Sequence, residues 1–179
     1  MQTRRIFLAW AFAWLGLRAQ ADATRPELTA LVGVQPQALS RFSVWGFDVY
    51  DARLWTASGF EVQQYARHAF ALELQYLRKL QGQAIAEKSL EEMRRLAQLP
   101  QDKAQAWLDI MRRALPDVTL GDRITGIHLP GQGAEFWFNG RRTAQVNDAQ
   151  FALLFFGIWL DARTSEPKLR ARLTQGLQP

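Results

Sequence analysis

Apolar and polar residues alternate with different periods along this chain, and the changes of period mark strands and helices. Residues 70–76 alternate apolar with small or polar side chains, which is typical of a half-buried strand. Over residues 83–99 the apolar positions recur at helical spacing, and Pro100 ends that helix. A second helix is predicted from about Asp102 to the next proline, Pro116. The first half of the chain therefore contains β-structure followed by two helices.

The second half begins with a predicted antiparallel meander. Its three strands are expected at residues 123–129, 134–138 and 141–146. Asn139-Gly140, between the last two strands, is a strong hairpin signal. Asp148 is placed to cap a helix over residues 151–160, which is apolar nearly all round and should be mostly buried. With a last helix ending at Gly176, these elements predict an α+β fold in which a helical layer covers one antiparallel β-sheet.

The N-terminus has the features of a cleavable signal peptide. Two arginines precede an apolar run of 12 residues, 6–17, and Ala-x-Ala sites follow it. The run is too short to span a hydrocarbon core of about 30 Å, so no stable membrane span is expected after cleavage, although an uncleaved anchor is the alternative. We predict export to the periplasm with cleavage after Ala21 or Ala23, leaving one domain over residues 24–179 after a leader at 1–23. Residues 3–8 also resemble a twin-arginine motif, so the export route stays open.

Composition disfavours several classes of function. Cleavage after Ala21 removes Arg4, Arg5 and Arg18 and leaves 19 of the 22 basic side chains against 17 acidic ones, so the net charge falls to +2 and nucleic-acid binding is not expected. The chain has no cysteine, which excludes thiol catalysis and thiolate metal sites. His68 and His128 have no carboxylate at ligand spacing, so we expect no metal and no cofactor, and both histidines at the surface of strands.

The segment at residues 41–55 carries the candidate chemistry. It is rich in β-forming aromatic and branched residues, yet it contains an arginine and a tyrosine nine positions apart, Arg41 and Tyr50. Even alternation would place them on opposite faces, whereas a one-residue bulge at Gly46 would bring the guanidinium and the phenol to the same face. Two fixed donors on an apolar wall suit a carboxylate or carbonyl on an otherwise apolar ligand.

Each candidate residue also has an ordinary structural interpretation. Arg41 can lie at a strand edge in solvent while Tyr50 simply packs. Asp48 would share a face with Tyr50 and can orient Arg41, or can repel an anion. Arg78 is a further candidate cation, or a solvated strand end.

Three blocks of sequence follow one another along the chain. They are residues 46–55 (GFDVYDARLW), residues 76–78 with 86–90 (YLR and AEKSL), and residues 121–126 (GDRITG) continuing through 138–140 to 155–160 (FFGIWL). In this order the blocks resemble the chalcone isomerase-like family, most closely its bacterial exported branch. The resemblance covers about residues 38–173. It implies a sheet with a helical layer, an open-faced sandwich, and a ligand cleft between them.

The resemblance also bears on the site. In fatty-acid-binding members, an arginine and a tyrosine on the early strands hold the ligand carboxylate, and Arg41 and Tyr50 match them with the spacing stretched by about one residue. Plant enzymes use a tyrosine and an asparagine where this chain has Ile85 and Glu92. This replacement leaves the polarising network of the enzymes incomplete.

The leading interpretation is an exported, non-catalytic protein that binds a small apolar ligand with a carboxylate or carbonyl head, such as a fatty acid, in a helix–sheet cleft. A first alternative is an intramolecular lyase or isomerase acting on a chalcone- or enone-like substrate, with Arg41 polarising a carbonyl and Tyr50 handling a proton; a perturbed Tyr50 pKa would favour it. A second is an envelope protein-interaction module that presents tryptophans to a partner, favoured by a filled cleft or by an Arg41–Asp48 pair. The oligomeric state stays open.

Overall fold

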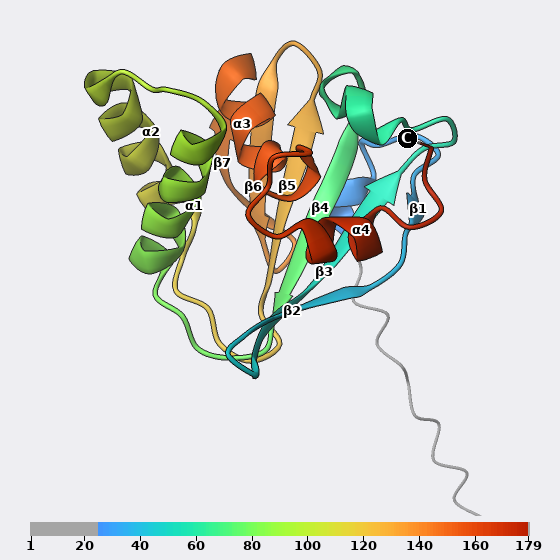
Figure 1. Ribbon diagram of the computed structural model, residues 1–179, viewed down its shortest axis with the longest axis horizontal. Coiled ribbons are helices and arrows are strands. Elements are labelled where there is room, and N and C mark those ends of the chain that lie inside the picture. The colour runs from blue at the N-terminus through green and yellow to red at the C-terminus, as the bar shows by residue number, and fades with distance from the viewer. Residues whose placement is uncertain (1–24, 179) are drawn as a thin grey trace, which may run out of the picture.

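The computed structural model describes residues 25–178, which form an antiparallel sheet of seven strands with helices on one face (Figure 1). The strands are β1 (Gln35–Pro36), β2 (Ser40–Val44), β3 (Phe47–Thr56), β4 (Phe70–Tyr76), β5 (Arg123–Leu129), β6 (Gly133–Phe138) and β7 (Arg141–Val146). Their order across the sheet is β1-β3-β4-β5-β6-β7, and β2 pairs with β3 beyond the end of β1. The predicted signal peptide lies outside the described residues.

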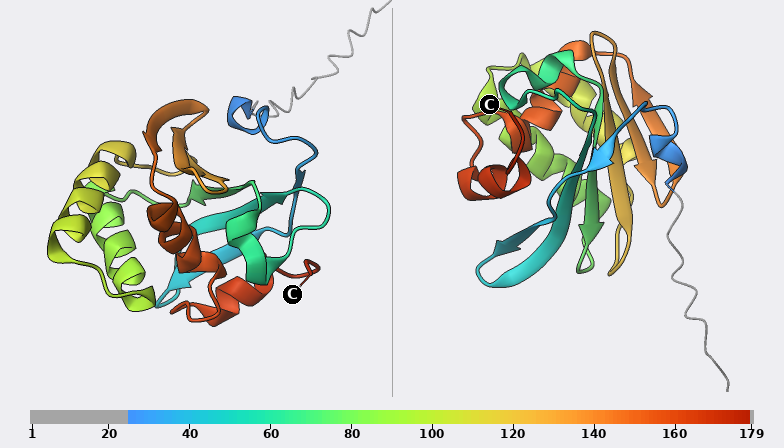
Figure 2. Two further views of the ribbon diagram at one scale, coloured as in Figure 1. Left: turned by 90° about the horizontal axis from the view of Figure 1, so that it is seen from above. Right: turned by 90° about the vertical axis from the view of Figure 1, so that its right-hand side faces the viewer.

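Four α-helices and two short 3₁₀ helices complete the described part of the chain. They are α1 (Gly82–Leu96), α2 (Gln101–Ala114), α3 (Ala149–Leu160), α4 (Pro167–Leu173), η1 (Pro26–Leu28) and η2 (Val62–Arg67). The α-helices lie on one face of the sheet, whereas η1 lies on the other (Figure 2). The predicted α+β class with a helical layer is therefore confirmed. Within residues 25–178, no helix combines the length and the apolar character needed to cross a bilayer.

The predicted buried helix, α3, forms the centre of the core. Asp148 caps it by accepting a hydrogen bond from the Phe151 backbone N–H at 3.0 Å, as expected. Phe151, Phe155 and Phe156 are buried, and Phe156 packs over Gly126 of β5, where an added Cβ would lie 3.1 Å from its ring. An apolar helix of this kind is stable because nearly all its surface is removed from water.

The other face of the sheet carries a buried ion network beneath the N-terminal segment. Glu73 of β4 accepts hydrogen bonds from Arg25 at 2.6 and 3.2 Å and lies 3.4 Å from Arg123. Arg123 also donates to Glu27, which is 1% exposed and accepts a further bond from Thr125. Buried charges need such partners, so the network holds η1 against the strands.

The expectation that both histidines lie at the surface is wrong for His128. Its side chain is 3% exposed, stacks on Phe70, and its Nδ1 lies 2.7 Å from the backbone oxygen of His68. Burial lowers the pKa of His128, so the ring is neutral near pH 7. The reason is that strand β5 is central, and the helical layer covers the face on which His128 lies.

The β2–β3 hairpin decides which side chains of the segment 41–55 meet. Its turn is Trp45-Gly46, with φ angles of 49° and 81°, so Gly46 belongs to a two-residue turn and the predicted bulge at Gly46 is wrong. The bulge is Val49, because Ser43 lies opposite Asp48 whereas Phe42 lies opposite Tyr50.

The position of this bulge separates the two predicted donors. A regular hairpin about this turn would place Arg41 directly opposite Tyr50, on one face. The extra residue shifts Arg41 opposite Asp51, so Arg41 and Tyr50 face opposite sides of the sheet. The predicted shared face is therefore wrong, although a bulge does interrupt the hairpin.

Candidate functional site

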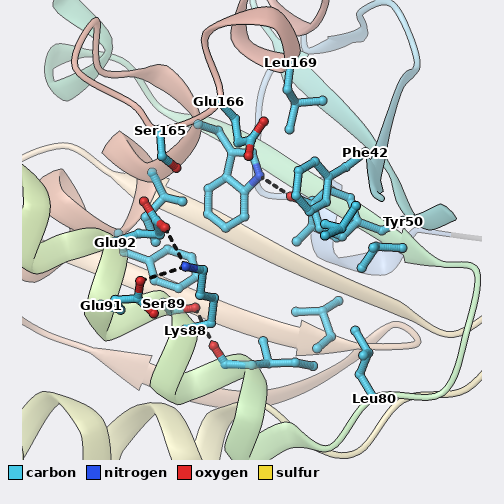
Figure 3. A pocket seen from close by; sticks show the side chains of 18 of the residues that line it. Phe42, Tyr50, Leu80, Lys88, Ser89, Glu91, Glu92, Ser165, Glu166 and Leu169 are labelled. Atoms are coloured by element: carbon cyan, nitrogen blue, oxygen red, sulfur yellow. Dashed lines mark hydrogen bonds and ion pairs between the residues drawn. The ribbon is translucent and has the colours of Figure 1, made fainter. Parts of the chain in front are cut away.

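A pocket of about 550 Å³ opens between α1, α4, the C-terminal half of α3 and the strands β2 to β5 (Figure 3). This volume lies within the range of about 300–1,000 Å³ that is usual for small-molecule sites. The walls are largely apolar and include Phe42, Leu74, Ile124, Phe155, Trp159 and Leu169. The helical layer therefore leaves part of the sheet uncovered, and the side chains on that part are apolar.

Local sequence patterns explain how α1 and the strands present these side chains. On α1, Ile85, Ser89 and Glu92 follow each other at intervals of four and three residues, which places them along one face of the helix. On β4, Leu74 and Tyr76 are two positions apart and project to the same side. This face of α1 and this side of β4 both contribute side chains to the pocket lining.

Tyr50 supplies a hydroxyl group to the pocket wall. The Trp159 Nε1–H donates to the Tyr50 oxygen at 3.1 Å, so a tryptophan occupies one acceptor position of the phenol (Figure 3). The phenol proton itself has no acceptor among residues 25–178. Burial raises the pKa of Tyr50, with smaller contributions from Glu166 and Glu92, so the group stays protonated at neutral pH. Tyr50 can therefore donate a hydrogen bond to a ligand.

Tyr76 places a second phenol beside the first. It lies directly opposite Tyr50 in the β3–β4 ladder, and the two rings meet edge to face with centroids 6.0 Å apart. Its side chain lines the pocket, and its hydroxyl has no hydrogen-bond partner in the described part of the chain. Burial, and then the proximity of Tyr50, raises the pKa of Tyr76. The two tyrosines form a neutral donor pair, which we call the tyrosine pair.

Charged side chains form the edge of the pocket along α1. Lys88 binds Glu91 and Glu92 at 2.9 Å each, and Arg95 lies 3.5 Å from Glu92. Partial burial by itself raises the pKa of Glu92, but hydrogen bonds from Lys88 and Ser165 outweigh it and leave the pKa below its usual value. Glu92 is thus an ionised partner of the two cations, and the edge is close to electrically balanced.

The remaining predicted site residues lie away from the pocket lining. Arg41 donates to Asp51 at 2.8 and 2.9 Å and to Asp48 at 3.0 Å, so Asp48 does orient Arg41. The bulge at Val49 puts Asp48 on the face of Arg41, so the predicted shared face of Asp48 and Tyr50 is wrong. Their hydrogen bonds raise the pKa of Arg41, with Asp51 as the larger cause. Arg78 is exposed, with its guanidinium 5.6 Å from the centre of the Phe47 ring. Of the four predicted residues, Tyr50 alone lines the pocket.

Ile85 and Glu92, the positions that the resemblance matched to the enzymes' tyrosine and asparagine, both line the pocket. The site therefore has an apolar side chain and a paired carboxylate at these positions. The pKa of Tyr50 is raised, so its phenol loses a proton less readily than usual. This direction opposes a role in which the phenolate abstracts a proton from a substrate. The interaction-module alternative predicted a filled cleft or an Arg41–Asp48 pair. The cleft is open, whereas the Arg41–Asp48 pair is present.

Sequence reasoning missed Tyr76 and the role of Trp159. Alternation from Leu72 through Leu74 to Tyr76 was the available signal, since it puts Tyr76 on the helical face of the sheet. Trp159 was expected in the core, and it is 7% exposed, but its indole also fixes the Tyr50 hydroxyl. Within residues 25–178 no three His, Asp or Glu side chains cluster at distances suited to a metal ion.

The fold and the pocket define an α+β protein with an apolar ligand-sized cleft between sheet and helices. Residues 39–174 match the model of the chalcone isomerase-like family, and the chain belongs to that family. An uncharacterized protein of Haemophilus influenzae is 30% identical over 130 residues, which cover 72% of this chain and 62% of that protein.

A solved structure shares the fold. The crystal structure of a fatty-acid binding protein from Arabidopsis thaliana superposes with a TM-score of 0.57 at 13% sequence identity, over 79% of this chain and 84% of that one. At this identity the likeness concerns the fold.

Proposed function

We propose that this protein is a non-catalytic carrier that binds a small apolar molecule in the pocket and directs an uncharged oxygen of that molecule to the tyrosine pair. The observation that carries the proposal is an open apolar pocket of about 550 Å³ in which the Tyr50 proton has no acceptor among residues 25–178. The shared fold with a fatty-acid binding protein supports an apolar-chain ligand.

The charge distribution favours a carbonyl, hydroxyl or protonated carboxyl over a carboxylate at the tyrosine pair. Arg41 faces the other side of the sheet, and Lys88 and Arg95 at the edge are paired with Glu92. Arg170 also lines the pocket, and its Nε–H donates to the Leu160 backbone oxygen at 2.7 Å. A carboxylate buried without a cation costs several kcal/mol, whereas a hydrogen bond from a phenol to a neutral acceptor contributes about 1 kcal/mol. The ligand head is therefore expected to be neutral where it meets Tyr50.

The test compares a fluorescent-tailed long-chain fatty acid with its methyl ester. The ester is expected to bind at least as tightly as the acid at pH 7.5, and Tyr50→Phe is expected to weaken ester binding about fivefold, the equivalent of one hydrogen bond. Arg41→Ala should leave binding unchanged. A requirement for Arg41, or a strong preference for the ionised acid, would contradict the proposed placement of the head.

Blocking the pocket provides a second arm. Ile85→Trp fills the lining from α1, and Gln83→Trp adds the same side chain at an exposed position of the same helix. Probe binding should disappear in Ile85→Trp and persist in Gln83→Trp. Equal binding by both would place the ligand elsewhere, and native mass spectrometry of protein isolated from cells would then identify what is retained.

Export to the periplasm is part of the same proposal. The sequence features of residues 1–23 support it. The intact mass of the protein recovered from the periplasmic fraction should correspond to a chain beginning at Asp22 or Thr24. Recovery of the full-length chain in the cytoplasm would contradict export.

A further inference from the structure

One end of the molecule gathers exposed apolar side chains. Four of the seven large apolar residues exposed among residues 25–178 lie there, namely Val44, Trp45 and Phe47 in the β2–β3 hairpin and Leu120 in the turn before β5. Trp45 is 95% exposed, Leu120 73% and Phe47 64%. The hairpin tip and the loops after β4 and before β5 lie at the same end in Figure 1. We call this surface the apolar end.

Hydrogen bonds join these loops into one surface. The Leu77 backbone N–H donates to the Val49 oxygen at 2.9 Å, which ties the loop after β4 to the hairpin. The Gly121 N–H donates to the Tyr76 oxygen at 2.8 Å, which ties the turn carrying Leu120 to the same loop. The apolar end is thus a continuous part of the fold, extending from one hairpin across two neighbouring connections.

Trp45 occupies a position that the fold itself does not favour. Both turn residues have positive φ, and this turn type prefers Asn-Gly, because a bulky side chain in the left-handed region is strained. The indole is almost completely in solvent, so packing within the chain does not offset that strain. A strained, exposed aromatic residue at a tip points to a contact outside the chain.

Unpaired positive charge borders the apolar end. Arg78 and Lys79 are exposed, and neither forms an ion pair with a carboxylate of residues 25–178. The Arg78 guanidinium lies over the Phe47 ring, so aromatic and basic groups occur together.

The carboxylates near this end are held by the chain itself. Asp48 is bound by Arg41 and Ser43, and Asp122 accepts from the Thr119 backbone N–H and from Asn139. Asp117 accepts from the backbone N–H at the start of α1. None of these three carboxylates is bound to Arg78 or Lys79, so the two cations stay available to an external anion.

We propose that the apolar end is a docking site for the surface of an anionic lipid bilayer, into which Trp45 and Phe47 insert while Arg78 and Lys79 contact lipid phosphates. Aromatic residues with neighbouring lysines and arginines are the combination that favours the membrane interface. A convex two-residue turn is poorly suited to burying the roughly 800 Å² per partner of a stable protein interface, whereas a bilayer accommodates a protruding tip.

The pocket reaches this surface. Val44 and Val49 of the hairpin, and Leu80 of the following loop, line the pocket wall. Docking would therefore bring one wall of the pocket to the lipid interface, where an apolar ligand could be exchanged; this consequence rests on the proposed carrier function, whereas docking itself does not.

The test is flotation of the protein with vesicles. The chain used is residues 24–179, since the apolar run at 6–17 would itself partition into lipid and residues 25–178 contain the whole described sheet and core. Vesicles of phosphatidylglycerol and phosphatidylethanolamine are compared with vesicles of phosphatidylcholine. We expect the protein to bind the anionic vesicles, and 0.5 M NaCl to weaken the binding.

Two variants and a matched control make the test specific. Trp45→Asn suits the positive φ, so it should fold at least as stably while reducing the vesicle partition coefficient about tenfold. Arg78→Gln with Lys79→Gln should reduce it about fivefold for each charge removed. Val32→Asn, at a residue 91% exposed on the N-terminal segment, should change little.

Three outcomes would overturn docking: no flotation of the unaltered chain, flotation unaffected by Trp45→Asn, or concentration-dependent dimerisation that Trp45→Asn abolishes in the absence of lipid. The Ile85→Trp variant separates this proposal from the carrier function, because a chain with a blocked pocket should still float.

Discussion

Tyr50 and Arg41 come from one short stretch of sequence, and a single extra residue between them determines that they do different things. The bulge at Val49 turns Arg41 toward Asp51 and leaves Tyr50 facing the pocket beside Phe42, with which it stacks at 5.0 Å. The residue types, and hence their chemistry, can be read from the sequence. The face toward which each side chain points depends on where the bulge interrupts the strand pairing, and the sequence did not show that position.

At the residue scale, His128 predicts a pH dependence of stability. Its folded pKa is lowered from 6.5, so between the two pKa values the unfolded chain binds more protons than the folded one. The contribution of His128 is thus fully present above about pH 6.5 and is lost as the pH falls below it, with a slope of up to about 1.4 kcal/mol per pH unit. Urea unfolding at pH 7.5 and 5.0 measures the difference.

His128→Asn is the control for that prediction. An asparagine amide can still donate toward the His68 oxygen but does not titrate. The variant should lose less stability between pH 7.5 and 5.0 than the unaltered chain. An unchanged difference would show that other groups cause the pH dependence.

Glu73 carries a second residue-scale prediction. It is 4% exposed and is the shared partner of Arg25 and Arg123, so Glu73→Ala removes a buried carboxylate that lies between these two cations. We expect a loss of about 3 kcal/mol in the free energy of unfolding by urea titration. Glu91→Ala, which removes an ion pair whose side chains are about 60% exposed, should cost within about 0.5 kcal/mol. Equal losses would mean that the buried network does not stabilise the fold.

At the element scale, a carboxylate accepts a hydrogen bond from a backbone N–H in the first turn of two helices, Asp117 for α1 and Asp148 for α3. Asp148 is the clearest case, because one carboxylate oxygen caps α3 and the other accepts from the buried Trp107 Nε1–H at 3.1 Å. The cap was predictable from the sequence, since aspartate immediately precedes a long apolar run. The bond to Trp107 was not, because it joins α2 to α3 across 41 residues.

Substitution at Asp148 separates these two roles. Asp148→Ala should lower the free energy of unfolding by about 2 kcal/mol, roughly half from the lost cap and half from the unpaired indole. Asp148→Asn keeps an oxygen for the cap but brings an amide donor to the indole, so an intermediate loss is expected. Urea titration followed by circular dichroism checks the order, which would be contradicted if asparagine were as stable as aspartate.

At the scale of the whole molecule, the pocket exists because the helical layer does not cover the sheet completely. The helices α1 and α4 lie on either side of α3 in Figure 1, and residues of all three helices line the pocket together with residues of β2 to β5. A cleft of this kind arises from how the helices pack on the sheet, since no strand or helix that borders it has an unusual structure of its own.

Ligand binding should therefore appear as stabilisation of the entire domain. A ligand bound only by the folded state at 100 times its dissociation constant adds about 2.7 kcal/mol to the free energy of unfolding. The methyl-ester probe should raise the unfolding temperature of the unaltered chain and of Gln83→Trp, but not that of Ile85→Trp. A rise in all three would indicate binding outside the pocket.

Much of the fold was predictable, and the errors have physical causes. The strands at 70–76, 123–129 and 141–146 agree with the structure residue for residue, because turn residues and alternation bound them sharply. The 3₁₀ helices η1 and η2 and the strand β1 were missed, since elements of two to six residues carry too little periodicity to stand out. His128 was placed at the surface because burial depends on what packs over a strand.

The sequence by itself determined the order of the elements, the α+β class, the apolar helix at the centre of the core and the presence of Tyr50 in the candidate site. Those properties follow from periodicity, capping and residue type, which act within a few neighbouring positions. Only the tertiary structure decided that Arg41 turns away, that Tyr76 and Trp159 join Tyr50, and that a pocket stays open between them. Pairing register and packing between distant segments govern those features, and one residue of shift in register moves a side chain to the other face of the sheet.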